Sequence, residues 1–182
     1  MILSDKIKKL IMSQEILSKL SVNHIDDLSS SRNEPDWLKD YRKNSLSIYD
    51  DMPIETSPLY NKYTDAKKMS PSKVSLSTST TQTIPKFLEK RLGELENEIC
   101  IIQIGTNIYK INLPDDLKSK GLVISSISDA IKNDSELVKK SLEASNSKED
   151  KFTALNNAAF NSGIFIHIPR NLIVEKPIHF MI

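Results

Sequence analysis

Residues 152–182, "FTALNNAAFNSGIFIHIPRNLIVEKPIHFMI", decide the fold. The first part predicts a helix that ends near Gly163 and carries its apolar side on Phe152, Leu155, Ala159 and Phe160. The second part holds three short apolar runs, "IFIHIP", "LIVEKP" and "IHFMI", with prolines between them. Short strands separated by turns are typical of the beginning of a sheet or β-solenoid. We therefore expect strands that need further stacked strands to complete a core.

Two changes in composition organise the rest of the chain. Residues 1–65 are rich in charge, have apolar residues at helical spacing and contain no glycine. Residues 70–83, "SPSKVSLSTSTTQT", contain nine Ser or Thr in fourteen and are typical of a linker. We predict four segments, namely an N-terminal helical region (1–65), a Ser/Thr-rich linker (66–83), an α+β region (84–162) and the first strands of a solenoid (163–182).

The N-terminal region contains three predicted helices. Apolar spacing predicts helices over residues 4–20 and 22–30, and the clearest helix lies in "SRNEPDWLKDYRKNSLSIYDDMP", residues 31–53. In that third helix we expect Asn33 at the N-cap, Pro35 in the first turn and Pro53 beyond the end.

One face of the third helix is rich in apolar and aromatic residues. Trp37, Tyr41, Ser45 and Ile48 fall on this face, flanked by Leu38 and Tyr49. Such a stripe usually packs against the core of its own domain. Contact with a partner protein is the alternative, and Trp37, Tyr41 and Ile48 are the candidate residues for either role.

The α+β region begins with a predicted helix over about residues 85–96. Two runs rich in β-branched residues follow, 99–104 and 108–113, and the loop between them contains Gly105. This spacing predicts a β-hairpin over 99–113. A short strand and one or two helices are expected in "GLVISSISDAIKNDSELVKKSLEAS".

Composition and charge exclude several classes of function. Lys and Arg number 25 against 24 Asp and Glu, so no net field favours nucleic acid. No long uncharged apolar run predicts a signal peptide or membrane span, and we expect a cytoplasmic protein. The single cysteine excludes an internal disulfide.

No catalytic, cofactor-binding or metal-binding residue is predicted. A stable iron–sulfur cluster needs several thiolates, and the chain has only Cys100. We expect Cys100 to be a buried structural residue, and a transient ligand or persulfide carrier is the alternative. His24, His167 and His179 lack the spacing of metal ligands.

Three stretches, in the same order, resemble the SufB/SufD family of iron–sulfur cluster assembly proteins. "RNEPDWLKDYRKNSLSIYDDMP" resembles an N-terminal helix of the family, and "IIQIGTNIYKINLPDDLKSKGLVISSISDAI" resembles the hairpin region of its SufD branch. The family's entry into its β-helix is matched by Leu155, Asn156, Gly163, Pro169 and Pro177. Asn171 stands where the family usually has Gly, and Asn can imitate Gly in a left-handed turn.

The resemblance implies an α+β fold that leads into a right-handed parallel β-helix, interrupted at residue 182. It also implies a non-catalytic scaffold subunit that acts with a SufB-type subunit and a SufC-type ABC ATPase, as a homo- or heterodimer. The assembled complex, and not this chain, is implied to handle an iron–sulfur cluster. A stand-alone helical interaction module is the alternative, although the apolar strand at the end of the sequence argues against it.

Overall fold

The computed structural model describes most of the chain, over residues 20–53, 84, 86–145 and 147–182. The predicted linker lies outside the described residues, as does the predicted helix over 4–20 apart from its last residue. The chain divides into two compact units, and each is described by itself. The first unit comprises residues 1–76 with 143–160, and the second comprises 77–142 with 161–182.

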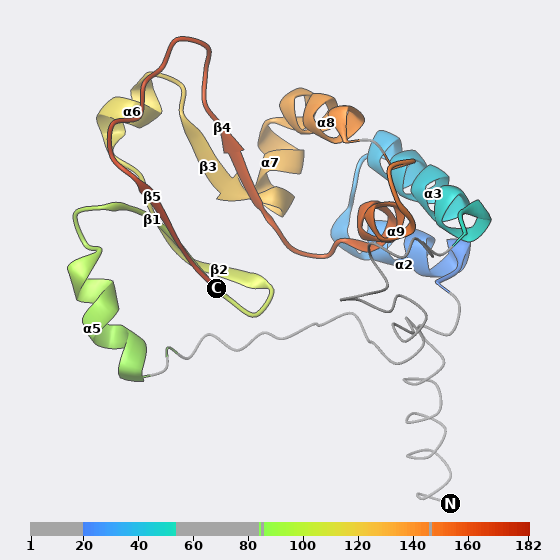
Figure 1. The fold of residues 1–182 in the computed structure, drawn as a ribbon, viewed down its shortest axis with the longest axis horizontal. Helices are drawn as coiled ribbons and strands as arrows, with labels where there is room; N and C mark the ends of the chain where they lie inside the picture. The colour runs from blue at the N-terminus through green and yellow to red at the C-terminus, as the bar shows by residue number, and fades with distance from the viewer. Residues whose placement is uncertain (1–19, 54–83, 85, 146) are drawn as a thin grey trace, which may run out of the picture. The chain divides into compact units, whose positions relative to one another are not determined.

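The described part of the first unit contains three helices, α2 (Val22–Arg32), α3 (Asp36–Asp51) and α9 (Lys151–Ala159) (Figure 1). Helix α2 confirms the helix expected over 22–30 and is two residues longer. Helix α3 confirms the clearest expectation of the N-terminal region. Ile25, Leu46 and Ala158, one residue from each helix, form a cluster of buried apolar residues, and Leu38 and Ala154 are also fully buried.

Asn33 does not begin α3, as the sequence predicted, but ends α2. Its φ of 51° places it in the left-handed region, which Asn tolerates and which commonly ends a helix. Its N–H donates to the carbonyl of Ser30 at 3.2 Å. Pro35 is the N-cap of α3, where the N–H that proline lacks is not needed.

Helix α9 begins at a strong cap and ends earlier than expected. The Asp150 carboxylate accepts the N–H groups of Phe152 at 2.7 Å and Thr153 at 2.9 Å, which satisfies two otherwise unpaired donors. The helix ends at Ala159, because Phe160 turns to an extended conformation with ψ 132°. Gly163 is therefore not the helix terminator, and its carbonyl instead accepts the N–H of Ile127 at 2.9 Å.

The second unit contains four helices in its described part, of which α5 confirms the expected helix after the linker. They are α5 (Lys86–Glu94), α6 (Asp115–Ser119), α7 (Ile127–Asn133) and α8 (Ser135–Ala144), whose last two residues cluster with the first unit. The hydroxyl of Ser126 accepts the N–H of Asp129 at 3.0 Å and so caps α7.

A three-stranded mixed sheet in the order β2-β1-β5 forms one layer of this unit. Strands β1 (Ile99–Ile104) and β2 (Asn107–Asn112) pair antiparallel and confirm the predicted hairpin. Its loop is shorter than expected, because Asn107 already pairs with Ile104, and Gly105 supplies the positive φ of 60° that so tight a turn needs. Strand β5 (Ile178–Met181) pairs parallel to β1 (Figure 1).

A second, two-stranded sheet pairs β3 (Val123–Ser126) antiparallel with β4 (Ile164–His167). Of the three apolar runs predicted after Gly163, the first and third are strands and the middle one, residues 172–177, is not. Leu172 and Val174 in that middle run pack on the core instead of pairing. The described residues form a mixed α+β fold with two small sheets, and no β-helix is seen among them.

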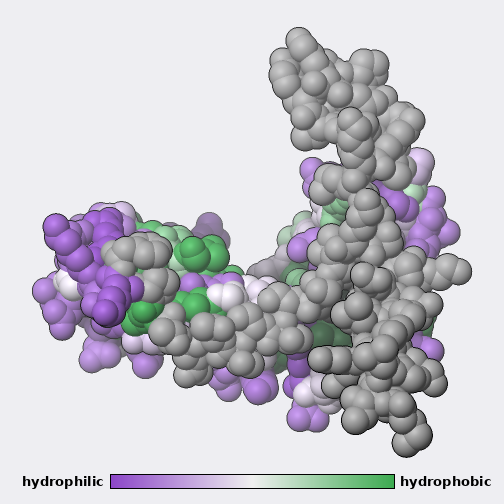
Figure 2. All heavy atoms as spheres, turned by 90° about the horizontal axis from the view of Figure 1, so that it is seen from below, coloured by the Kyte–Doolittle hydropathy of each residue, from purple (hydrophilic) through white to green (hydrophobic). Residues whose placement is uncertain are grey.

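The core of the second unit is made of large aliphatic side chains from both sheets. Ile99 and Ile101 of β1 are buried with Leu122 and Ile124. The other side of β1 is buried by α5 and its following turn, where Leu92 and Leu95 pack with Cys100 and Ile102. In the part of Figure 2 that holds α5, apolar residues in green gather beside polar ones in purple.

Candidate functional site

The candidate face of α3 is only partly buried. The helix buries Leu38, Arg42, Ser45 and Leu46. Trp37, Tyr41 and Ile48 are half-buried. The fold places the charged Arg42 in the interior, a position for which the sequence analysis made no prediction. Whether Trp37, Tyr41 and Ile48 contact a partner stays a prediction.

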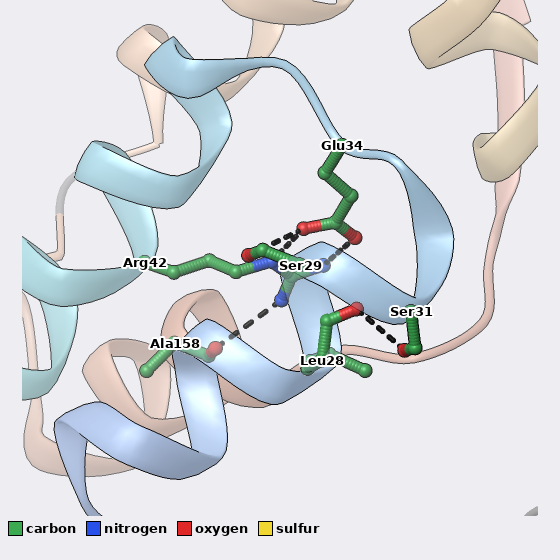
Figure 3. Close-up of polar contacts among 6 residues, drawn as sticks. All are labelled: Leu28, Ser29, Ser31, Glu34, Arg42 and Ala158. Carbon is green, nitrogen blue, oxygen red and sulfur yellow. Dashed lines mark hydrogen bonds and ion pairs between the residues drawn. The ribbon is translucent and has the colours of Figure 1, made fainter.

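Arg42 forms a buried ion pair with Glu34 (Figure 3). Its side chain is 0% exposed, and that of Glu34 is 4% exposed. Nε donates to Oε2 and Nη2 donates to Oε1, both at 2.8 Å. Such a bidentate pair compensates both charges and most of their hydrogen-bonding groups, which is what makes burial of the pair tolerable.

The same guanidinium reaches the end of α9. Nη1 donates to the carbonyl oxygen of Ala158 at 3.2 Å (Figure 3). The ring of Phe160 lies against the guanidinium, with its centroid 4.0 Å from the central carbon. Because the last carbonyls of a helix lack partners within it, Arg42 acts as a tertiary cap for α9.

Lys151, at the start of α9, makes a similar contact with the end of α3. Its ammonium group donates to the carbonyl oxygens of Tyr49 and of Met52, the latter at 2.8 Å. The ammonium also lies 4.3 Å from the centroid of the Tyr49 ring. Burial, followed by the charge of Asp50, raises the pKa of the Tyr49 hydroxyl.

Hydroxyl and amide groups lie between α3 and the residues around α9. The hydroxyls of Ser45 and Ser147 are 3.3 Å apart, and the Asn157 amide donates to Ser147 Oγ at 2.8 Å. Sequence reasoning missed Arg42, Lys151 and Asn157, because such side chains usually face solvent. The contacts of Arg42 and Lys151 join residues 116 and 102 positions apart, so no local pattern indicates them. Asn157 contacts Ser147, ten positions before it.

Two carboxyls of this unit have lowered pKa values. Hydrogen bonds from Thr153, first from its hydroxyl, hold the pKa of Asp150 below its usual range. Lys39 and Lys43, each with its ammonium 2.8 Å from Asp26 Oδ1, lower the pKa of Asp26. The first carboxyl caps a helix, and the second ties α2 to α3.

The residues of the family-like motif lie at helix ends and turns. Leu155 is half-buried on α9, and the carbonyl of the exposed Asn156 accepts the N–H of Phe160 at 2.8 Å. Gly163 lies in the connection to β4. Pro177 is exposed directly before β5. Leu155 and Asn156 thus belong to the first unit, and Gly163, Pro169 and Pro177 belong to the second.

Pro169 belongs to a turn that confirms the expectation for Asn171. The carbonyl of Pro169 accepts the N–H of Leu172 at 3.1 Å. Asn171 has a φ of 69°, in the left-handed region where Gly is more usual. Gly121 approaches this turn so closely that a Cβ there would lie 3.1 Å from Pro169 Cγ.

Cys100 is a core residue of β1 and only 1% exposed. Its Sγ donates a weak hydrogen bond to the carbonyl of Leu95 at 3.8 Å. Its register partner on β5 is His179, a neighbour that the sequence did not indicate. The expectation that Cys100 is a buried structural residue thus agrees with its position in the core.

The other two histidines belong to other elements than Cys100. His24 Nδ1 accepts the N–H of Ser21 at 3.1 Å and belongs to the cap of α2, while His167 lies on β4. Within residues 20–53, 84, 86–145 and 147–182, no group of three or more His, Cys, Asp or Glu side chains could hold a metal ion. In the same ranges, no helix has the length and apolar character to cross a membrane.

Comparison with known proteins points to one family. The family model described as the SufBD protein N-terminal region matches residues 29–180. The iron–sulfur cluster assembly protein SufD of Bacillus subtilis is 30% identical over 169 residues, which cover 88% of this chain and 38% of that protein. An iron–sulfur cluster assembly SufBD family protein of Staphylococcus aureus is 27% identical over 171 residues, or 87% of this chain and 37% of that protein. The chain thus spans less than two-fifths of the length of these relatives.

Proposed function

Because the chain belongs to the SufBD family through its N-terminal region, we propose that it is the N-terminal portion of a SufD-like scaffold subunit in iron–sulfur cluster assembly. The observation that carries the proposal is the family match over residues 29–180. The SufD branch is favoured by the 30% identity to a protein named SufD and by the likeness of residues 101–131 to that branch.

The proposed role is non-catalytic. Support comes from how polar and charged side chains of the first unit are used. Arg42 and Glu34 neutralise one another, Lys151 holds the end of α3, and Asp150 caps α9. These groups fix helix positions. The iron–sulfur cluster would be the cargo of the assembled complex, with no ligand supplied by the described part of this chain.

The strands support a proposed continuation into a right-handed parallel β-helix. Strands β1 and β5 pair in parallel over four register positions, from Ile99 with Ile178 to Ile102 with Met181. Parallel neighbours of this kind are the pairs from which stacked rungs are made. Strand β5 is an edge of its sheet, and Phe180 on it is 48% exposed. A further strand on this edge would cover that side chain.

The partners proposed are a SufB-type subunit and a SufC-type ABC ATPase in the cytoplasm, in a homo- or heterodimeric scaffold and without nucleic acid. We keep as a proposal the division of the sequence into four segments, 1–65, 66–83, 84–162 and 163–182. The face of Trp37, Tyr41 and Ile48 is proposed to contact one of the partners.

Affinity purification of the endogenous protein from its native host tests the assignment. The intact mass should be measured, and co-purifying proteins identified against a mock purification. We expect an ABC-type ATPase and a second SufBD family protein, together with lower activity of iron–sulfur enzymes when the protein is depleted. Absence of the ATPase and unchanged iron–sulfur enzymes would overturn the scaffold proposal and favour an interaction module.

The partner face can be tested in the same purification. Replacing Tyr41 by Ala removes a half-buried aromatic ring from α3, and we expect less partner protein to co-purify. Tyr109→Ala on β2 is the matched control, since that ring is 45% exposed. Equal recovery with both variants, at equal helical content by circular dichroism, would exclude Tyr41 from the partner face.

A further inference from the structure

Helices α2 and α3, here called the α2–α3 pair, are joined to the second unit by a long stretch of chain. Helix α3 ends at Asp51 and α5 begins at Lys86, so residues 52–85 form this connection. No described helix or strand interrupts it. A stretch of this length can span up to about 110 Å. The α9 on which the pair docks therefore need not belong to the same chain.

Helix α9, in contrast, has short connections on both of its sides. Helix α8 ends at Ala144 and α9 begins at Lys151. After α9 ends at Ala159, β4 begins at Ile164. Helix α9 therefore stays with the second unit of its own chain, whereas the α2–α3 pair can reach a second molecule.

The contact between α3 and α9 is extensive, and the two helices lie against one another in Figure 1. Leu46 and Ala158 belong to one buried apolar cluster. Leu38 of α3 and Ala154 of α9 are fully buried as well. Burial of apolar groups stabilises a contact in the same way whether the two helices come from one chain or from two.

Polar groups make this contact specific for the sequence of the chain itself. Arg42 donates to the carbonyl of Ala158, and Lys151 donates to the carbonyl of Met52. A foreign surface must offer carbonyl oxygens at the same places, or it leaves these donors without partners. A second copy of this chain offers the same acceptors at the same places.

We propose that the face of α9 formed by Lys151, Ala154, Ala158 and Phe160 is a docking site for the α2–α3 pair of a second copy of this chain. Each chain gives its pair and receives that of its partner, so the exchange closes into a two-fold dimer. Closed monomer and exchanged dimer share the same contacts. A long connection keeps the effective concentration of the pair within one chain at roughly millimolar or below. The dimer therefore gains on the monomer as the protein concentration rises.

Disulfide trapping between two full chains tests the exchange. The hydroxyl oxygens of Ser45 on α3 and Ser147 before α9 are 3.3 Å apart, which is compatible with a disulfide after both residues are replaced by cysteine. One chain carries Ser45→Cys, and the other carries Ser147→Cys and a tag that changes its mass. The two are unfolded together in urea with a reductant, refolded at high protein concentration and oxidised. We expect a disulfide between the chains that becomes more abundant at higher protein concentration.

Ser119→Cys is the matched control for random collisions, because Ser119 is exposed on α6 in the second unit. With the Ser45→Cys chain it should give about 10-fold less inter-chain disulfide than Ser147→Cys does, since a disulfide needs a specific geometry. The native Cys100 is 1% exposed and is present in every sample. Equal yields with Ser119→Cys and Ser147→Cys, or no inter-chain disulfide, would overturn the proposal.

A chain that carries both Ser45→Cys and Ser147→Cys supplies a second test. Oxidised at low concentration, it should close its disulfide within one chain and lock the pair on its own α9. By light scattering after refolding at high concentration, we expect dimer in the parent and only monomer in the locked variant. A locked variant that dimerises as much as the parent would place the dimer contact elsewhere and overturn the proposal. Failure of the disulfide to close within the chain would overturn it too, because the contact between α3 and α9 would then be absent.

Discussion

The two units reach a buried core by different chemistry. Among the described residues of the first unit, the largest fully buried side chain is Arg42, neutralised by Glu34. In the second unit the largest cluster of buried residues among those described is aliphatic, with isoleucines of β1 at its centre, and Cys100 and Phe165 are also buried. Apolar burial is non-directional, whereas an ion pair must meet its geometry. The first unit should therefore be the more easily damaged by removal of one charge.

The largest expected effect comes from breaking the ion pair. Glu34→Leu leaves the guanidinium of Arg42 buried without its carboxylate, which typically costs about 3–5 kcal/mol in the free energy of unfolding. Trp37, the only tryptophan, lies in α3. Urea unfolding followed by its fluorescence therefore reports on this unit.

Two variants sharpen that result. The double change Glu34→Leu with Arg42→Met replaces both charges by apolar side chains and should recover much of the lost stability. Arg91→Met breaks an exposed pair with Glu94 and should change stability by about 1 kcal/mol or less. A Glu34→Leu effect as small as that of Arg91→Met would contradict a charge-dependent core.

The second prediction concerns the aliphatic core. Ile101→Ala removes buried methyl groups from the centre of β1 and should cost about 2–5 kcal/mol. The loss should be measured as faster hydrogen exchange in β1, β2 and β3. In low urea, the fluorescence of Trp37 in the Ile101→Ala variant should differ little from that of the parent. An equal loss of stability in both units would mean that they unfold together. The proposed difference between their cores would then have no effect on their stability.

Local patterns predicted most helices and the hairpin, because their signals lie within a few residues. Apolar residues at helical spacing indicated α3, and Gly105 marks the turn between β1 and β2. Asn33 was assigned to the wrong helix end, since the same side chain can cap an N-terminus or adopt a left-handed φ. Local sequence does not distinguish these two uses.

Contacts between distant segments could not be predicted in the same way. The parallel pairing of β1 with β5 joins Cys100 to His179, and the bond from Arg42 to Ala158 spans 116 positions. Alternation of apolar residues gives a strand but not its neighbour. For the candidate site, the spacing of apolar residues indicated the stripe of Trp37, Tyr41 and Ile48. It did not indicate Arg42, the charged residue that the fold buries.

The third prediction tests a backbone constraint in the second unit. Gly121 has a φ of 89°, and a methyl group added to its Cα would lie 3.1 Å from Pro169 Cγ. Gly121→Ala should cost about 1–3 kcal/mol from strain at this φ. Gly93→Ala, on α5 with nothing near the added methyl, should be neutral or stabilise by up to about 1 kcal/mol. Thermal unfolding of both variants checks this, and equal melting temperatures would refute the constraint.

The smallest effect expected is a dependence on acid that belongs to the first unit. Both carboxyls with lowered pKa values, Asp26 and Asp150, lie there. A carboxyl whose folded pKa is below its unfolded value of about 4 adds stability above that pH and loses it as the pH falls. Exchange in α3 and α9 should therefore rise relative to β1 when the pH falls below about 4, after correction for intrinsic exchange rates.

Asp150→Asn isolates the cap from the other carboxyls. The amide oxygen can still accept the N–H groups of Phe152 and Thr153, so at neutral pH the variant should lose only about 0.5–1 kcal/mol, the scale of a helix-end charge. Because the variant has no carboxyl to protonate, the difference from the parent should shrink as the pH falls through the acid range. A difference that stays constant with pH would assign the contribution of Asp150 to its hydrogen bonds alone. The acid sensitivity of the first unit would then have to come from Asp26 and its two lysines.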